Sequence, residues 1–137
     1  MKNEDTIYMW MAEAVSQASY AEKLKVGAII VKDGNVIAFG YNGTPAGFDN
    51  RCEDSENVTK PEVLHAESNA IAKCAKGTVS SDGSVLYTTT APCFDCAKLI
   101  IQAGIKKVFY RHLYRNNNGL ELLTKAGIEH DKVFHSH

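Results

Sequence analysis

The 137-residue sequence has almost no net charge and no long apolar run. Fifteen Lys and Arg residues nearly balance sixteen Asp and Glu residues, so there is no broad basic field of the kind that binds a long polynucleotide. No apolar stretch approaches the length of a membrane span, and the polar, acidic N-terminus does not resemble a signal peptide. We therefore expect a cytoplasmic protein with no polynucleotide and no membrane as partner.

The composition is that of a globular domain. A hydrophobic content of 45% with 23% charged residues excludes a disordered or fibrous chain, and this length makes one domain with its own core. We expect a single domain over residues 1–137. Four cysteines without an export signal favour free thiols over disulfides. Cys93 and Cys96 are spaced as a pair, whereas Cys74 fits a small core residue within a helix.

Hydrophobic periodicity predicts helices and strands in alternation. Ile7, Trp10 and Met11 belong to a helical apolar pattern, and Asp33-Gly34 lies between two β-branched runs, which predicts a hairpin. Helices are expected near 5–20, 61–76, 92–103 and 119–127, and strands near 26–31, 36–41, 85–90, 107–110 and 133–134. A loop rich in turn residues covers 42–61. This order predicts a three-layer α/β domain whose sheet is covered by helices on both faces.

Two short motifs carry the chemistry: His65-Ala66-Glu67 and Pro92-Cys93-Phe94-Asp95-Cys96. This spacing is the known signature of zinc-dependent deaminases. One imidazole and two thiolates supply three zinc ligands and leave a fourth, tetrahedral position open to water. Such a set is formally neutral and acidifies that water less than three histidines would, so a carboxylate that accepts the proton is useful. Glu67 has that position, and its separation from His65 by two residues keeps it from competing for the metal.

Two other interpretations of the motifs remain open. A closed structural zinc site needs a fourth ligand, and the candidates are His112, His130, His135, His137 and Cys52. None of them pairs with His65 at a spacing typical of zinc fingers. The Cys-x-x-Cys pair alone is also compatible with a redox dithiol.

Beyond the zinc pattern, most of the chain resembles the deoxycytidylate (dCMP) deaminases of the cytidine deaminase superfamily. The resemblance runs through the two motifs and through three further segments: Val26-Gly27-Ala28, Gly40-Tyr41-Asn42-Gly43-Thr44-Pro45 and 101–108. It implies a cytidine deaminase-like fold with a central, mixed five-stranded sheet. It also implies zinc-dependent hydrolytic deamination of dCMP to dUMP. The zinc motifs are shared with nucleoside, guanine and tRNA adenosine deaminases, so a deaminase of another base is the alternative.

The resemblance also implies roles for particular residues. Asn42 would contact the sugar of the substrate, and Tyr114 would close over it. Further substrate contacts are expected at Ala66, Ala91 and Pro92. The loop that contains Gly40, Tyr41, Gly43 and Thr44 would form a regulatory site between subunits, where dCTP activates, dTTP inhibits and Mg²⁺ accompanies the triphosphate. If the resemblance is set aside, Gly43 is simply a turn glycine and Tyr114 a half-buried aromatic residue.

The expected 5′-phosphate needs cationic or N–H donors. The candidates are Lys23, Lys25, Arg111 and Arg115, although residues of this kind are more often solvated surface charges. Members of the family form homo-oligomers, and a hexamer is the expectation here.

The sequence departs from the family pattern at Ser68, where Leu is more common. It also lacks the extra Cys and His residues that hold a second, structural zinc in some members, so one zinc per chain is expected and Cys52 is left free. The compact length suits a phage or bacterial enzyme; a phage protein would act in the host cytoplasm.

Overall fold

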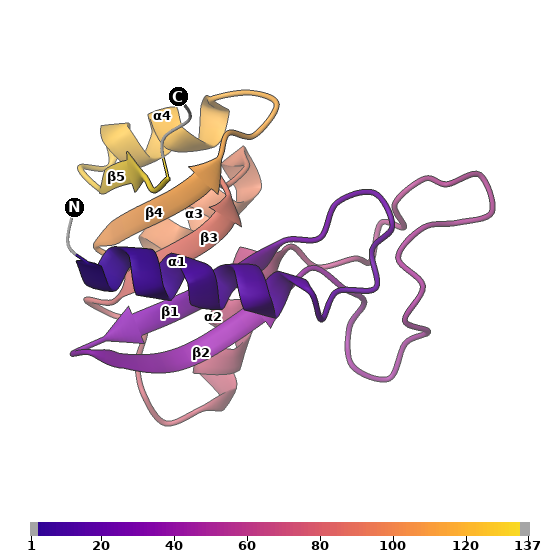
Figure 1. The fold of residues 1–137 in the computed structure, drawn as a ribbon, viewed down its shortest axis with the longest axis horizontal. Coiled ribbons are helices and arrows are strands. Elements are labelled where there is room, and N and C mark those ends of the chain that lie inside the picture. The colour runs from indigo at the N-terminus through magenta and orange to yellow at the C-terminus, as the bar shows by residue number, and fades with distance from the viewer. Residues whose placement is uncertain (1–2, 135–137) are drawn as a thin grey trace.

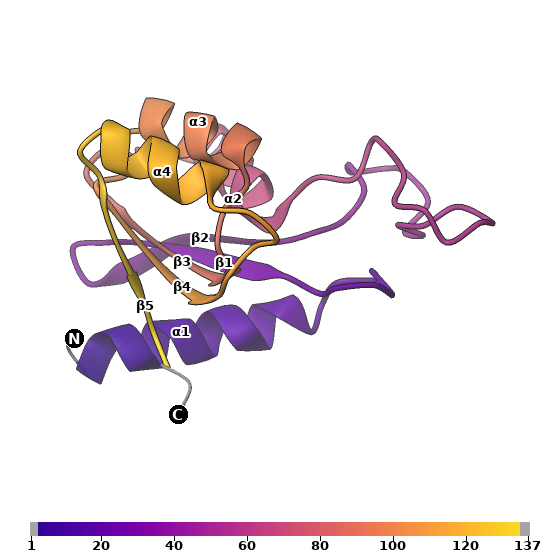
Figure 2. The same cartoon turned by 90° about the horizontal axis from the view of Figure 1, so that it is seen from above.

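The computed structural model describes residues 3–134 as a three-layer α/β arrangement. The sheet has the strand order β2-β1-β3-β4-β5. Figure 2 shows α1 beneath this sheet and α2, α3 and α4 above it. The predicted fold class is therefore confirmed. The elements are α1 (Asn3–Ser16), β1 (Gly27–Lys32), β2 (Asn35–Tyr41), α2 (Ala66–Lys76), β3 (Val85–Thr90), α3 (Phe94–Gln102), β4 (Lys107–His112), α4 (Asn118–Lys125) and β5 (Glu129–Lys132).

The sheet is mixed in direction. β1 pairs antiparallel with both β2 and β3, whereas β3 with β4 and β4 with β5 are parallel. The hairpin between β1 and β2 turns at Asp33 and Gly34, whose φ angles are 51° and 78°. Two positive φ angles are what a tight two-residue turn requires, so the predicted hairpin is confirmed. No helix within residues 3–134 combines the length and the apolar character needed to cross a membrane.

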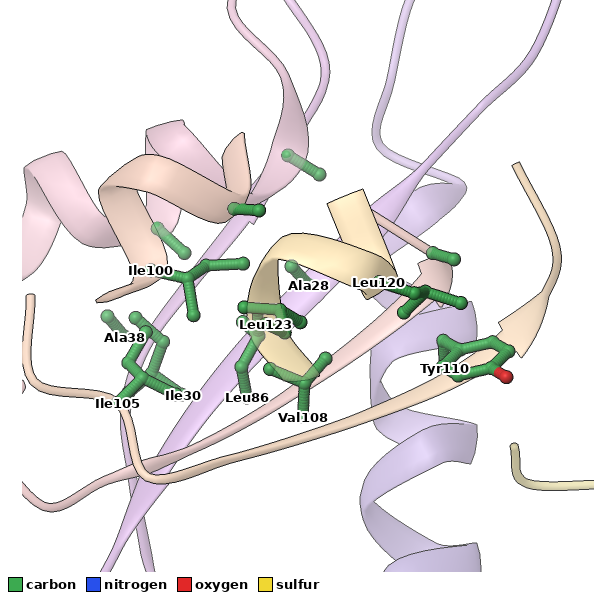
Figure 3. Packing of buried hydrophobic residues seen from close by; sticks show 14 of the residues in the cluster. Ala28, Ile30, Ala38, Leu86, Ile100, Ile105, Val108, Tyr110, Leu120 and Leu123 are labelled. Carbon is green, nitrogen blue, oxygen red and sulfur yellow. The ribbon is translucent and has the colours of Figure 1, made fainter. Parts of the chain in front are cut away.

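Two apolar clusters hold the layers together. The larger one lies between the sheet and the helices above it, where Ile100 of α3 and Leu123 of α4 pack over Leu86 and Val108 of the central strands (Figure 3). The smaller one joins α1 to the other face of the sheet and includes Met9 and Tyr87. Because both faces of the central strands are covered, the end of β3, which leads into Pro92 and Cys93, has a fixed position.

The sequence-based prediction of the buried face of α1 was wrong. Ile7, Trp10 and Met11 are exposed, whereas Met9, Ala12 and Ser16 are buried. The reason is a close approach at Gly27 of β1, where an added Cβ would lie 2.1 Å from the Ala12 carbonyl oxygen and 2.5 Å from the Ser16 nitrogen. Only small residues fit opposite Gly27, at Ala12 and Ser16, while Met9 packs into the smaller cluster and Ile7, Trp10 and Met11 face outward.

Several element boundaries also differ from the predictions. α1 ends at Ser16 rather than near residue 20, α2 begins at Ala66 rather than near 61, and β5 covers Glu129–Lys132 rather than 133–134. The start of α2 is delayed because Leu64 forms two backbone hydrogen bonds with Gly43. The segments 17–26 and 42–65 extend beyond the same end of the sheet (Figure 1).

Candidate metal centre and catalytic cavity

The starts of α2 and α3 bring the two motifs together. His65 is the N-cap of α2 and Cys93 is the N-cap of α3, each with extended backbone. The helices predicted near 61–76 and 92–103 included His65, Pro92 and Cys93, but all three precede the observed helices. Cys96 lies in the first turn of α3, and its backbone N–H donates to Cys93 Sγ at 3.4 Å. The caps therefore fix the direction of the predicted ligands.

The distances within this group fit zinc. His65 Nδ1 lies 3.3 Å from Cys96 Sγ and 3.4 Å from Cys93 Sγ. Tetrahedral zinc, with its usual bond lengths to imidazole nitrogen and thiolate sulfur, would separate these donors by roughly 3.5 Å. Across residues 3–134, His65, Cys93 and Cys96 form the group of potential metal ligands whose donor atoms all lie within 4.8 Å of one another. One imidazole and two sulfur donors are a ligand set that zinc prefers.

The pKa values of the two thiols shift in opposite directions because the two side chains are hydrogen-bonded to each other. A hydrogen bond from the Cys96 side chain lowers the pKa of Cys93 to about 4. The same hydrogen bond, together with burial, raises the pKa of Cys96. A hydrogen bond to Cys93 also raises the pKa of His65. Because metal ligands must be deprotonated, a bound metal would displace the protons held by this cluster.

Glu67 lies one residue inside α2 and is 4% exposed. Burial raises the pKa of its carboxyl to about 7. It is not part of the ligand group, in keeping with the expected separation between His65 and Glu67. A buried carboxyl beside the ligands and open to a cavity has the chemistry of a group that takes up and releases a proton.

A cavity of about 300 Å³ adjoins this centre. Among the residues predicted from the sequence, nine line it: Lys23, Asn42, His65, Ala66, Glu67, Ala91, Cys93, Tyr114 and Arg115. Eight more were missed: Ala21, Leu24, Val26, Cys52, Glu53, Thr59, Val63 and Thr90. Most of the missed residues come from the parts of segments 17–26 and 42–65 that lie between the motifs and have no periodic pattern.

Asn42 connects these segments. The Val26 N–H donates to Asn42 Oδ1 at 2.8 Å, and Asn42 Nδ2 donates to the Leu24 carbonyl oxygen at 2.8 Å. The side chain predicted to contact a sugar therefore also anchors the backbone at 24–26. One of the two N–H groups on Nδ2 is enough for this contact, which leaves the second for another acceptor.

The four phosphate candidates separate into two pairs. Lys23 and Arg115 line the cavity, and the Arg115 guanidinium lies 5.2 Å from the centre of the Tyr114 ring. Lys25 does not line it. Arg111 is held away from it by an ion pair of 3.0 Å with Glu13 of α1. The structure therefore gives no support for Lys25 or Arg111 as phosphate ligands.

The residues predicted for regulation lie outside the cavity. An added Cβ at Gly40 would lie 2.5 Å from the Ala70 nitrogen and 2.6 Å from the Ala66 carbonyl oxygen, so this glycine is needed for close packing of β2 against α2. Gly43 pairs with Leu64, and Thr44 Oγ1 donates to the Asp49 carbonyl oxygen at 2.8 Å. The Tyr41 carbonyl oxygen accepts a hydrogen bond from Asn69.

Of the candidates for a fourth protein ligand that the structure describes, His112, His130 and Cys52, none is in the group around His65. His130 Nε2 instead lies 2.8 Å from Thr124 Oγ1. Cys52 is buried, and burial raises the pKa of its thiol. His135 and His137 lie outside the described residues.

Gly119 supports the metal centre from α4. An added Cβ there would lie 2.0 Å from the Pro92 carbonyl oxygen and 2.8 Å from that of Cys93. We expect Gly119→Ala to displace the Cys93 segment, to cost about 1–3 kcal/mol of stability and to weaken zinc binding. Thermal unfolding and zinc titration would measure both effects. Gly43→Ala is the matched control, since its nearest neighbour is 3.8 Å away. Equal behaviour of the two variants would contradict the supporting role of Gly119.

Comparisons with known proteins agree on one family. A model of the cytidine and deoxycytidylate deaminase zinc-binding region matches residues 2–112. ComE operon protein 2 of Bacillus subtilis is 39% identical over 131 residues, which cover 92% of this chain and 69% of that protein. Deoxycytidylate deaminase of Saccharomyces cerevisiae is 37% identical over 134 residues and 90% of this chain, but the chain spans only 43% of that protein.

The solved structures include a dCMP deaminase from the cyanophage S-TIM5 in complex with dCMP and dUMP. It is 50% identical, has a TM-score of 0.94, and matches over 97% of this chain and 99% of that one. The family model covers both motifs, and the His65, Cys93 and Cys96 donors fit the zinc for which the family is described. The chain belongs to the cytidine and deoxycytidylate deaminase zinc-binding family.

Proposed function

We propose that this protein catalyses the hydrolytic deamination of dCMP to dUMP and ammonia. The observation that carries the proposal is buried Glu67 beside a three-donor zinc site, in a cavity whose wall also holds two cationic side chains. The similarity to the cyanophage dCMP deaminase over nearly its whole length supports the choice of substrate. We also propose that residues 1–137 act as one catalytic domain in the cytoplasm.

The chemistry divides between the metal and the protein. Zinc held by His65, Cys93 and Cys96 would lower the pKa of water and so supply a nucleophile at neutral pH. Glu67 would take one proton from the attacking water and deliver it to N3 of the cytosine ring. It would then take the second proton and pass it to the departing amino group, so that water is consumed and ammonia leaves. Because Glu67 is buried, bulk water would have little access to its carboxyl during these steps.

The remaining cavity residues would hold the nucleotide. We propose that Asn42, Ala66, Ala91 and Tyr114 contact its base and sugar, with Pro92 supporting the adjacent backbone. Lys23 and Arg115 would bind the 5′-phosphate, because both line the cavity and cationic donors bind phosphate strongly. The stacking of Arg115 on Tyr114 links that cation to the side chain expected to close over the substrate.

Regulation and assembly are further proposals. We propose activation by dCTP and inhibition by dTTP, with Mg²⁺ bound to the triphosphate, at a site built from the loop of Gly40, Tyr41, Gly43 and Thr44. All four lie outside the catalytic cavity, as a separate effector site requires. A hexamer would place this loop between subunits.

A substrate panel tests the catalytic proposal. We expect faster ammonia release from dCMP than from deoxycytidine, CMP, dCTP, guanine or a tRNA anticodon stem-loop, because phosphate contacts with Lys23 and Arg115 are available only to a nucleotide that fits the cavity. Each reaction is run with and without dCTP and dTTP. Faster turnover of deoxycytidine would exclude the nucleotide assignment. Turnover of dCMP that ignores both effectors would leave the catalytic proposal and remove the regulatory one.

A further inference from the structure

Glu53 is a buried carboxylate in the wall of the catalytic cavity. It is 3% exposed, and within residues 3–134 it forms no ion pair with a Lys, Arg or His side chain. Its oxygens instead accept hydrogen bonds from the backbone N–H groups of Glu22, at 3.2 and 3.3 Å, and of Lys23, at 3.5 Å. A buried charge needs such partners, so these contacts explain how the carboxylate is tolerated there.

The backbone around Glu53 is fixed by hydrogen bonds. Its neighbours form a small hairpin in which the Asp54 N–H donates to the Val58 carbonyl oxygen and the Lys60 N–H to that of Cys52, both at 2.8 Å. Glu53 itself is bridged to Thr59. These contacts fix where the carboxylate can reach.

The segment that Glu53 contacts, residues 17–26, contains no helix or strand. Hydrogen bonds hold it near its two ends. Ser19 Oγ donates to the Asn42 carbonyl oxygen at 2.7 Å, and Asn42 Oδ1 accepts from Val26 at 2.8 Å. Between these points, Glu53 contacts the backbone at Glu22 and Lys23. Asn42 Nδ2 holds the next residue through the Leu24 carbonyl oxygen, and Glu53 adds the contact to the backbone N–H of Lys23 itself.

We propose that Glu53 is a positioning residue that holds Lys23 at the cavity wall, where Lys23 binds the phosphate of the substrate. This proposal rests on the proposed function. Lys23 and Glu53 line the same cavity as Glu67. A lysine ammonium on a long, flexible stem binds phosphate well only where its backbone is fixed. Loss of Glu53 would therefore weaken recognition of the phosphate and spare the chemistry at the base.

The test compares Glu53→Gln with Glu56→Gln, an exposed residue of the same hairpin that does not line the cavity. The Glu53→Gln change removes the negative charge and turns one of the two oxygen acceptors into an N–H donor, so the Glu22 and Lys23 N–H groups keep only one acceptor between them. We expect kcat/KM for dCMP to fall about tenfold or more, mainly through KM, and kcat/KM for deoxycytidine to change little. Glu56→Gln should behave as the wild type.

A double-mutant cycle with Lys23→Ala tests the coupling. If Glu53 acts through Lys23, the double variant loses no more dCMP activity than Lys23→Ala alone. Additive losses, or equal losses for dCMP and deoxycytidine, would overturn the proposal. If Glu53→Gln does not fold, Glu53→Asp, which keeps the charge on a shorter stem, gives the same comparison. A wild-type protein that does not prefer dCMP would instead contradict the proposed function itself.

Discussion

Replacing Glu67 by glutamine is expected to lower the turnover of dCMP by about 10²–10⁴-fold or more, with zinc content and fold retained. The carboxyl is buried beside the ligand group but is not one of its donors. Glutamine keeps its size and polarity yet cannot take a proton from water or pass one to the ring nitrogen. Steady-state kinetics, metal analysis and circular dichroism measure the three quantities.

Glu62→Gln is the matched control, because Glu62 is exposed and precedes α2. It removes the same charge from the same part of the chain and should leave turnover unchanged. Near-normal turnover in Glu67→Gln would exclude the acid–base role. The protein would then belong with the zinc-stabilised binding modules that the sequence left as an alternative.

Local signals in the sequence predicted the hairpin and the metal-binding motifs well. The turn at Asp33-Gly34 depends on the conformations of these two residues alone, and both have the positive φ angles that the turn needs. His65 and the Cys93–Cys96 pair each stand at the start of a helix, so a correct order of elements was enough to suggest that they meet. The exact cap positions depended on tertiary pairing, such as that of Leu64 with Gly43, and were missed.

Long-range contacts explain why the sequence-based predictions failed for the buried face of α1 and for Glu53. The apolar pattern of Ile7, Trp10 and Met11 is helical, but the packing of α1 is decided by the space above Gly27, which periodicity does not report. Likewise, Glu53 reaches the cavity through its contacts with Glu22 and Lys23, some thirty residues earlier in the chain. A carboxylate in a turn-rich loop is usually solvated, and the sequence contains no pattern that identifies this one as buried.

Replacing Cys96 by alanine is expected to reduce the zinc content from one ion per chain to nearly none and to abolish deamination. Cys96 is buried, and its sulfur lies 3.3 Å from His65 Nδ1, so loss of the thiolate leaves only two protein donors. Two donors hold zinc far more weakly than three, and binding energy lost at a native site is also lost stability. Metal analysis after dialysis, together with unfolding temperatures with and without added zinc, would measure both.

Cys52→Ala is the control that separates one zinc from two. Cys52 is also a buried thiol on the cavity wall, but it does not belong to the donor group of His65. Because Cys52 is expected to remain a free thiol, this variant should keep one zinc per chain. Zinc retained by Cys96→Ala, or two ions in the wild type of which Cys52→Ala loses one, would contradict the single-site assignment. Loss of zinc and activity in Cys96→Ala alone would tie the chemistry to the His65, Cys93 and Cys96 donors.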